Sequence, residues 1–203
     1  MPTKSKRAYH HGNLRPALLE AALELILEVG PQSFTLREVA RRARVSHAAP
    51  YRHVADKDAL LAERAAEGFR LLGEATTLDP AATDPARAFQ ATGAGYLRFA
   101  IEHPAHYRLM FGDAIADPRA HPDLATHGDH AFQILLDSIT MCQGAGLVRA
   151  GDPMELAIAT WSMVHGLASL IIDGRLREVI DARGPDAVIE SVTATLMTGL
   201  IRR

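Results

Sequence analysis

Residues 34–57 read FTLREVARRARVSHAAPYRHVADK, and this stretch decides the fold of the N-terminal part of the chain. Thr35 and Glu38 have the T-x-x-E spacing of a capping box, in which each side chain binds a free backbone N–H at a helix start. Phe34 and Val39 occupy the positions of a hydrophobic staple. Apolar residues recur at helical spacing, at Leu36, Val39, Ala40 and Ala43. The sequence therefore predicts a short helix directly after Thr35.

A second short helix is predicted after Ser46, which is a favoured N-cap residue. The turn between the two helices is about three residues long, as in helix-turn-helix units. We expect a second helix of about seven residues, because Pro50 in its fourth position removes only the hydrogen bond back to the cap carbonyl. Such a unit presents one helix to the DNA major groove. Two surface helices with solvated arginines are the alternative for this stretch taken alone.

Charge is distributed unevenly along the chain. Residues 1–57 carry ten Lys and Arg against five Asp and Glu, a net charge of +5, and residues 58–203 carry twelve against nineteen, a net charge of −7. A basic N-terminal part attracts polyphosphate, and an acidic remainder discourages wrapping by nucleic acid. The first residues read as a flexible arm that contacts phosphate or the minor groove, or as a tail without a role; its basic residues are Lys4, Lys6, Arg7, His10 and His11.

Further helices are predicted on both sides of this unit. Asn13 caps a helix that tolerates Pro16 in its first turn and ends at Gly30-Pro31. Asp56 caps a longer helix from about Lys57 to about Thr76. The N–H groups at the start of that helix and the Lys57 ammonium can share one phosphate.

Residues 10–61 carry the order of features found in one family of regulators. They read HHGNLRPALLEAALELILEVGPQSFTLREVARRARVSHAAPYRHVADKDALL: a helix ending in Gly, a T-x-x-E/V-A unit, V-S before the second helix, then Y-x-H and K-x-x-L-L. This part resembles the DNA-binding domain of the tetracycline-repressor (TetR) family. The stretches GYLRFAIEHPAHYRLMF (95–111) and WSMVHG (161–166) resemble a subgroup with a Trp-His-Gly motif, here Trp161, His165 and Gly166.

The resemblance implies roles for individual residues. Thr35, Tyr51, His53 and Lys57 match positions that contact phosphate, and the first turn of the second helix matches the part that meets base edges. Arg37, Arg42, Arg44 and Arg52 are either electrostatic anchors or a solvated basic face. The DNA-binding set expected from the resemblance is Thr35, Arg37, Arg44, Ser46, His47, Ala48, Ala49, Tyr51, Arg52, His53 and Lys57.

The chain departs from the family pattern at Arg44, where the family has glycine, at Pro50, where it has a large aliphatic residue, and at Val54, where an aromatic residue is common. If the turn requires a positive φ at Arg44, the strain there costs roughly 1 kcal/mol or more.

Helical periodicity predicts an all-α fold, with residues 1–57 as a basic arm and helix-turn-helix domain and residues 58–203 as a ligand-binding and dimerisation domain. The C-terminal helices are expected at about 84–102, 105–111, 129–145, 153–172 and 185–201, and 112–126 reads as a loop. The last two helices are strongly apolar, so we expect 153–173 and 185–202 to pack against their copies in a homodimer. A dimer suits a palindromic operator.

Aromatic, methionine and histidine residues are concentrated in the C-terminal part. Trp161 and His165 lie four residues apart and share a helix face, where they can line an apolar pocket or only lock helices together. The expected pocket residues, each with packing as the alternative, are Phe99, His103, Tyr107, Met110, Phe111, Phe132, Trp161 and His165.

The remaining features restrict the class of protein. Cys142 is the only cysteine, and the apolar stretch 154–172 is interrupted by polar residues, so we expect a cytoplasmic protein without a disulfide or membrane span. No cofactor or catalytic motif is present. The expected function is a repressor released from DNA by a small molecule. The alternatives are a helical ligand-binding or scaffold protein without an operator, and a metal-dependent enzyme using His121, His127 and His130.

Overall fold

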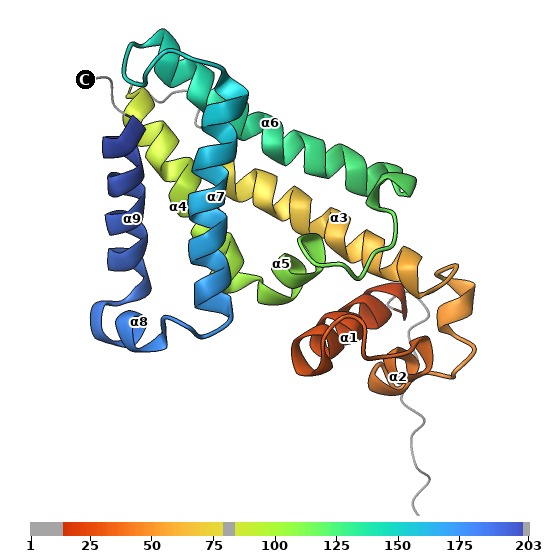
Figure 1. The fold of residues 1–203 in the computed structure, drawn as a ribbon. Coiled ribbons are helices and arrows are strands. Elements are labelled where there is room, and N and C mark those ends of the chain that lie inside the picture. The colour runs from red at the N-terminus through yellow and green to blue at the C-terminus, as the bar shows by residue number, and fades with distance from the viewer. Residues whose placement is uncertain (1–13, 79–83, 201–203) are drawn as a thin grey trace, which may run out of the picture.

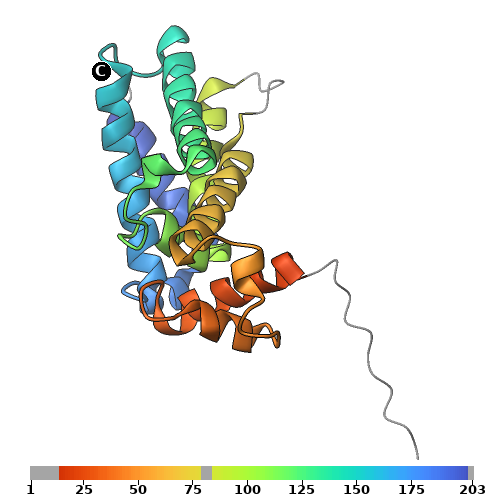
Figure 2. The ribbon, with the colours of Figure 1, turned by 90° about the vertical axis from the view of Figure 1, so that its right-hand side faces the viewer.

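The computed structural model describes residues 14–78 and 84–200, and these residues form helices with no β-strand among them. Figure 1 shows a small N-terminal head at one end of a larger helical body, and Figure 2 shows the same arrangement from the side. The expected all-α fold is confirmed. The elements are α1 (Leu14–Val29), α2 (Leu36–Arg42), η1 (Pro50–Arg52), α3 (Lys57–Thr76), α4 (Pro85–Glu102), α5 (Pro104–Met110), η2 (Pro118–Ala120), α6 (Pro122–Gly144), α7 (Pro153–Ile172), α8 (Arg177–Arg183) and α9 (Pro185–Leu200).

Proline and aspartate set many of the helix starts. The helices α4, α5, α6, α7 and α9 all begin with proline, whose fixed φ suits the first helical position and whose missing N–H is not needed there. Asp56, Asp84 and Asp152 cap α3, α4 and α7, and each carboxylate accepts hydrogen bonds from backbone N–H groups of the first turn. The predicted bounds of α3 and α7 are therefore confirmed.

The structure of the body differs from the sequence-based expectations at two helices. The helix α6 begins at Pro122, seven residues before the expected start near Asp129. The stretch before Asp129 is rich in loop-forming residues, but Pro122 occupies the first position of the helix, where proline is favoured. The short helix α8 was not expected. The helix α9 buries large apolar residues, and its exposed face carries small and polar side chains, among them Ala187, Ser191, Ala194 and Thr198.

Two hydrophobic clusters organise the core. One joins α1, α2 and the first half of α3 to Ala105 and Leu109 of α5, to Ile115, and to Leu124 of α6. The other joins the end of α3 to α4, α6, α7 and α9. At Gly95 the backbones of α4 and α3 approach so closely that a Cβ atom there would lie 2.0 Å from the Ala75 carbonyl oxygen. The long helix α3 belongs to both clusters and so joins the head to the body.

The helix α7 leaves much of its apolar surface uncovered. By length and composition alone it could cross a membrane, with a mean hydropathy of 1.4 over its most apolar window. The exposed large apolar residues Ile158, Met163 and Leu170 lie along this helix, beside residues of the same helix that are buried in the core. A helix with one face in a protein core and one uncovered face is also typical of a contact between subunits.

Candidate DNA-binding surface and ligand cavity

The start of α2 has the predicted capping box. Thr35 Oγ1 accepts a hydrogen bond from the Glu38 N–H at 3.3 Å, and the Glu38 carboxylate accepts one from the Thr35 N–H at 2.7 Å. The backbone and hydroxyl donors of Thr35 hold the pKa of Glu38 below its usual range. Phe34 and Val39, the predicted staple pair, are both buried in the first cluster. This geometry fixes the direction in which α2 leaves the preceding turn.

The end of α2 requires a left-handed residue, and that residue is Arg44. The Val45 N–H donates to the Ala40 carbonyl at 2.9 Å and the Arg44 N–H to the Arg41 carbonyl at 3.1 Å, which together form a Schellman motif. Arg44 has a φ of 57°, and it is the one residue other than glycine with a positive φ in the described part of the chain. The sequence-based expectation of a strained position at Arg44 is confirmed.

The second helix of the unit differs from the expectation. Residues 46–54 form a turn followed by the single 3-10 turn η1, instead of an α-helix of about seven residues. Pro50 has no N–H to donate to the Ser46 carbonyl, which instead accepts from the Ala49 N–H at 2.9 Å. The His53 N–H likewise bonds to the Pro50 carbonyl, three residues earlier, at 2.9 Å. Pro50 thus favours backbone hydrogen bonds between residues three apart, as in a 3-10 turn, over those between residues four apart, as in an α-helix.

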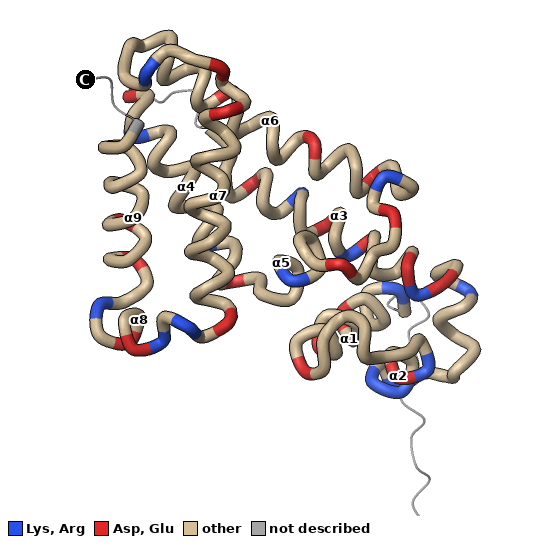
Figure 3. The backbone as a smooth tube through the Cα atoms, viewed as in Figure 1, with Lys and Arg blue, Asp and Glu red and all other residues tan. Residues whose placement is uncertain are grey.

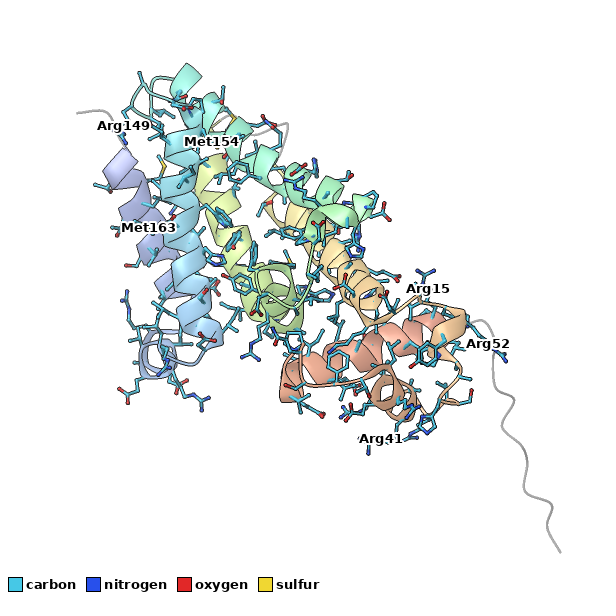
Figure 4. The ribbon with its side chains drawn as sticks, turned by 45° about the vertical axis from the view of Figure 1, so that its right-hand side comes forward. Arg15, Arg41, Arg52, Arg149, Met154 and Met163 are labelled. Atoms are coloured by element: carbon cyan, nitrogen blue, oxygen red, sulfur yellow. The ribbon has the colours of Figure 1, made fainter. Side chains whose placement is uncertain are left out.

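Most of the expected DNA-binding side chains are exposed at this end of the head; they are Thr35, Arg37, Arg44, Ser46, His47, Ala48, Tyr51, Arg52 and His53. In Figure 3 Lys and Arg gather around α2, and in Figure 4 Arg41 and Arg52 project outward from the head. Ala49 is a correction to this set. Its side chain is only 7% exposed, because the tight turn before η1 folds it toward the core, and it cannot meet a base edge there.

Two further cations of the head are engaged within the protein. Arg42 forms ion pairs with Glu24 and Glu28 of α1, so it is a link between α1 and α2 rather than the expected free anchor. The Lys57 ammonium donates to the carbonyls of Gln32 at 3.1 Å and Phe34 at 2.7 Å. Partial burial lowers the pKa of Lys57. Among the described residues two of its three N–H donors are therefore engaged. The expected basic arm and the expected cap Asn13 lie outside the described residues.

A cavity of about 630 Å³ lies within the body, between α3, α4, α6, α7 and α9. Of the expected pocket residues, Met110, Phe111, Phe132 and Trp161 line it. Phe99, His103, Tyr107 and His165 are not part of its lining. Arg119 and Asp129 are the charged residues of the wall in the described part of the chain, and they form an ion pair of 2.8 Å.

A hydrogen-bond network behind the cavity wall explains the position of His165. Its Nδ1 atom lies 2.9 Å from the hydroxyl groups of both Tyr96 and Tyr107, and the Trp161 Nε1–H donates to the Tyr96 hydroxyl at 3.3 Å. Burial lowers the pKa of His165 and raises the pKa of Tyr96. Tyr96 lines the cavity but was missed from sequence, although it lies three residues before Phe99 on the same helix.

The segment from Phe111 to His121 contacts both the cavity and the head. Phe111, Ile115 and Arg119 line the cavity. On the other side Asp113 accepts a 2.7 Å hydrogen bond from the Gln32 side chain, and the His121 ring nitrogen lies 2.8 Å from the Asp58 carboxylate. No periodicity in the sequence signals this role, because its partners are 58 to 81 residues away.

The histidines considered for a metal site do not gather. His121 is bonded to Asp58, and residues 14–78 and 84–200 contain no group of three or more His, Cys, Asp or Glu side chains arranged to hold a metal ion.

Comparisons with known proteins agree with this architecture. Residues 18–63 match the family model of bacterial regulatory proteins of the tetR family, and residues 89–196 match the model of the tetracyclin repressor-like C-terminal domain. No protein with a curated description matches the sequence.

Solved structures similar to the chain include a protein of unknown function from Rhodococcus sp. RHA1, with 31% identity over 97% of this chain and 100% of that one and a TM-score of 0.77. The TetR family regulator PfmR from Thermus thermophilus is 20% identical over 91% of this chain and 99% of its own, with a TM-score of 0.73. A tetR family regulatory protein from Rhodococcus RHA1 is 18% identical over 94% and 98%, with a TM-score of 0.78. These are regulators rather than enzymes where a function is given, and the second family model covers more than half of the sequence. The chain therefore belongs to the tetR family of bacterial regulatory proteins.

Proposed function

We propose that the protein is a sequence-specific transcriptional repressor that leaves its operator when a small molecule occupies the cavity of the body. The observation that carries this proposal is the segment 111–121, which lines the cavity on one side and on the other is bonded to Gln32 of the head and to Asp58 in the first turn of α3. In the proposed domain organisation, residues 1–57 form the DNA-binding domain and residues 58–203 form the ligand-binding and dimerisation domain.

In the proposed complex, base reading is limited to a short exposed turn. Ser46, His47 and Ala48 are exposed before η1, and an imidazole there can donate to guanine N7 or O6 while an alanine methyl can meet a thymine methyl. Because the segment contains only one 3-10 turn, few side chains can reach base edges. We therefore expect a short half-site and a large share of affinity from phosphate contacts.

The proposed phosphate contacts surround this turn. Tyr51 is 59% exposed, and Arg52 and His53 next to it are exposed as well. Arg37 and Arg44 add positive charge on the α2 side. Lys57 contributes its remaining donor, but its main interaction is with the turn between α1 and α2, so its removal also disturbs that turn.

We propose that two copies associate through α7 and α9, which stand side by side in Figure 1. Ile158, Met163 and Leu170 provide an uncovered apolar surface on α7, and Gly166 on the same helix has no atom within 4 Å of where a Cβ would lie, so a partner helix can approach closely. Members of this family dimerise and bind operator DNA. These helices lie within the expected interface segments 153–173 and 185–202. Residues 201–202 of the second segment lie outside the described residues.

Release from DNA follows from linkage between the two sites. The ligand is bound more tightly when the 111–121 segment lies farther from the cavity. Ligand binding then also disfavours the position of the head that this segment stabilises in the absence of ligand. In a symmetric dimer the spacing between the two heads then changes, and it no longer matches two half-sites on one face of the DNA. Couplings of this kind are typically about 1–3 kcal/mol. A soluble regulator of this kind acts in the cytoplasm, where the chromosome is accessible.

The proposal is tested by selecting binding sites from a random duplex DNA library with the purified full-length protein at about 150 mM salt, where non-specific binding is weak. The expected result is an enriched motif with two inverted half-sites. A parallel selection with Tyr51→Phe and Arg52→Ala is expected to enrich the same motif more weakly, since phosphate contacts carry no base information. A library that remains unenriched contradicts operator binding and supports the alternative of a ligand-binding protein without an operator.

A further inference from the structure

The chemistry of the cavity wall limits which ligands it can accept. Arg119 and Asp129 are the charged residues of the wall among the described residues, and they neutralise each other in a 2.8 Å ion pair. Their side chains are 71% and 63% exposed, so the pair lies at the solvent end of the cavity. The described residues that line the cavity farther inside offer no counter-charge. An ionised ligand group there would lose its hydration without gaining a partner.

Aromatic rings form much of the inner wall. Phe69, Phe111, Phe132 and Trp161 line the cavity, together with Phe89 and Tyr96. Phe69 and Phe111 are edge-to-face with ring centroids 5.5 Å apart, and Phe132 and Trp161 are edge-to-face at 6.0 Å. Rings held by one another in this way form a preorganised surface onto which a further planar ring can stack.

One hydroxyl group in the wall has no hydrogen-bond partner among the described residues. Thr76, Thr92 and Thr193 line the cavity and donate to the carbonyl four residues earlier in their helices, at 2.8, 3.1 and 2.9 Å. Thr160 also lines the cavity and is 3% exposed, but its Oγ1 atom has no hydrogen-bond partner among the described residues. A buried hydroxyl without a partner is uncommon and costs stability. The oxygen itself is covered, and rotation about χ1, which is accessible to threonine in a helix, can turn it toward the cavity.

We propose that the cavity binds an uncharged, largely apolar aromatic molecule whose hydrogen-bonding group is met by the Thr160 hydroxyl. This inference names the class of ligand for the proposed function. It rests on one part of that proposal, namely that the cavity is a ligand site. A volume of about 630 Å³ is enough for a polycyclic ligand.

Trp161 provides a direct readout, because it is the only tryptophan of the chain and lines the cavity. Quenching of its emission is measured with the full-length protein, without DNA, on titration with pyrene-1-carboxamide, pyrene-1-carboxylate and 1-pyrenemethylammonium. These probes share one ring system and differ in charge. The carboxamide is expected to bind at least about tenfold more tightly than either charged probe. Equal or tighter binding of a charged probe, or no binding of any probe, overturns the proposal.

The position of binding is tested with two glycines of the same helix. Gly128 lines the cavity, and Gly144 has no atom within 4 Å of where a Cβ would lie and is not part of the lining. Gly128→Leu is expected to reduce quenching by the carboxamide strongly, and Gly144→Leu to leave it unchanged. Equal quenching in both variants would show that pyrene adsorbs elsewhere, which contradicts the inference.

The role of the hydroxyl is tested with Thr160→Val and Thr160→Ser. Valine removes the hydroxyl and serine keeps it. We expect Thr160→Val to weaken carboxamide binding about five- to tenfold, Thr160→Ser to retain most of it, and both to bind unsubstituted pyrene like the original protein. Equal losses for pyrene and for the carboxamide would mean that Thr160 only shapes the cavity. Since DNA is absent from these titrations, a failure of operator binding does not affect their outcome.

Discussion

The side-chain amide of Gln32, in the turn between α1 and α2, donates a 2.7 Å hydrogen bond to the carboxylate of Asp113, 81 residues later in the chain. Asp113 directly follows Phe111 and Gly112, which line the cavity. The turn that contains Gln32 leads directly into the capping box of α2. A displacement of the cavity wall therefore has a short path to the helix-turn-helix unit.

We predict that Gln32→Glu reduces the effect of ligand on DNA binding, because two carboxylates then face each other where a hydrogen bond stood. The ratio of operator affinities with and without ligand should fall several-fold, corresponding to about 1 kcal/mol of lost coupling. Ligand affinity in the absence of DNA should hardly change, since Gln32 does not line the cavity. Gln32→Lys, which keeps a donor toward Asp113, is the matched control and should keep the coupling. If both variants respond to ligand like the original protein, the path does not run through this contact.

The strained turn after α2 gives a second prediction. Arg44, Gly146 and Gly174 occupy the same position in three Schellman motifs, with φ values of 57°, 71° and 69°. Arg44→Gly should raise the free energy of unfolding by about 0.5–1 kcal/mol, because glycine adopts this conformation without a Cβ clash. Gly146→Ala, which has no neighbouring atom within 4 Å to clash with, should lower it by a similar amount. Urea denaturation followed by circular dichroism measures both. Destabilisation by Arg44→Gly would mean that the arginine side chain stabilises the turn by more than the strain costs.

A third prediction concerns the subunit contact. Ile158 on α7 is 53% exposed, and a glutamate in its place would be buried without a partner in the proposed interface. Ile158→Glu should weaken the dimer on the order of 100-fold, since two-fold symmetry places the change at the interface twice. Leu27→Glu, at a residue of α1 that is 47% exposed, is the control and should leave association unchanged. Sedimentation velocity distinguishes the species. A stable dimer of the Ile158 variant would place the interface elsewhere.

A fourth prediction follows from buried histidines. Burial is the main cause that lowers the pKa of His106, only partly offset by its 3.1 Å contact with Glu67, and burial also lowers the pKa of His165. Both rings therefore take up a proton at a lower pH in the folded protein than in the unfolded chain, where the ordinary pKa is about 6.5. Stability should accordingly be fully present above a pH of about 7.5 and fall as the pH drops from there to about 5.5. His106→Gln should make the free energy of unfolding less dependent on pH across this range, as measured by urea titrations at each pH. An unchanged slope would assign the loss to other groups.

The sequence predicted well those features that depend on neighbouring residues. The capping box of α2 and the bounds of α3 and α7 follow from side chains acting on the backbone within one helical turn. The positive φ of Arg44 was instead expected from the glycine that the family has at this position. The 3-10 turn at Pro50 was not predicted, because an α-helix was expected to tolerate the one hydrogen bond that Pro50 cannot donate. In the structure the backbone instead forms hydrogen bonds to carbonyls three residues earlier on both sides of Pro50. The start of α6 was missed because the stretch before Asp129 is rich in residues that also form loops.

The candidate site was only partly accessible from sequence. Composition identified aromatic residues near the cavity, and Met110, Phe111, Phe132 and Trp161 do line it. Periodicity does not reveal which side of a helix faces a cavity and which faces a second helix. His165 was therefore expected to line the cavity, whereas in the structure it lies behind the wall and contacts the hydroxyl groups of Tyr96 and Tyr107. The contacts between Gln32 and Asp113 and between Asp58 and His121 join distant parts of the chain and depend on the complete fold.

The central claim is that the head reads a DNA sequence. The most direct measurement is a titration of the protein against a labelled duplex from upstream of its own gene and against a shuffled duplex of equal composition, at about 150 mM salt. We predict at least about 100-fold tighter binding to the upstream duplex, because specific regulators bind their sites far more tightly than other DNA. Equal affinity for the two duplexes would contradict the claim.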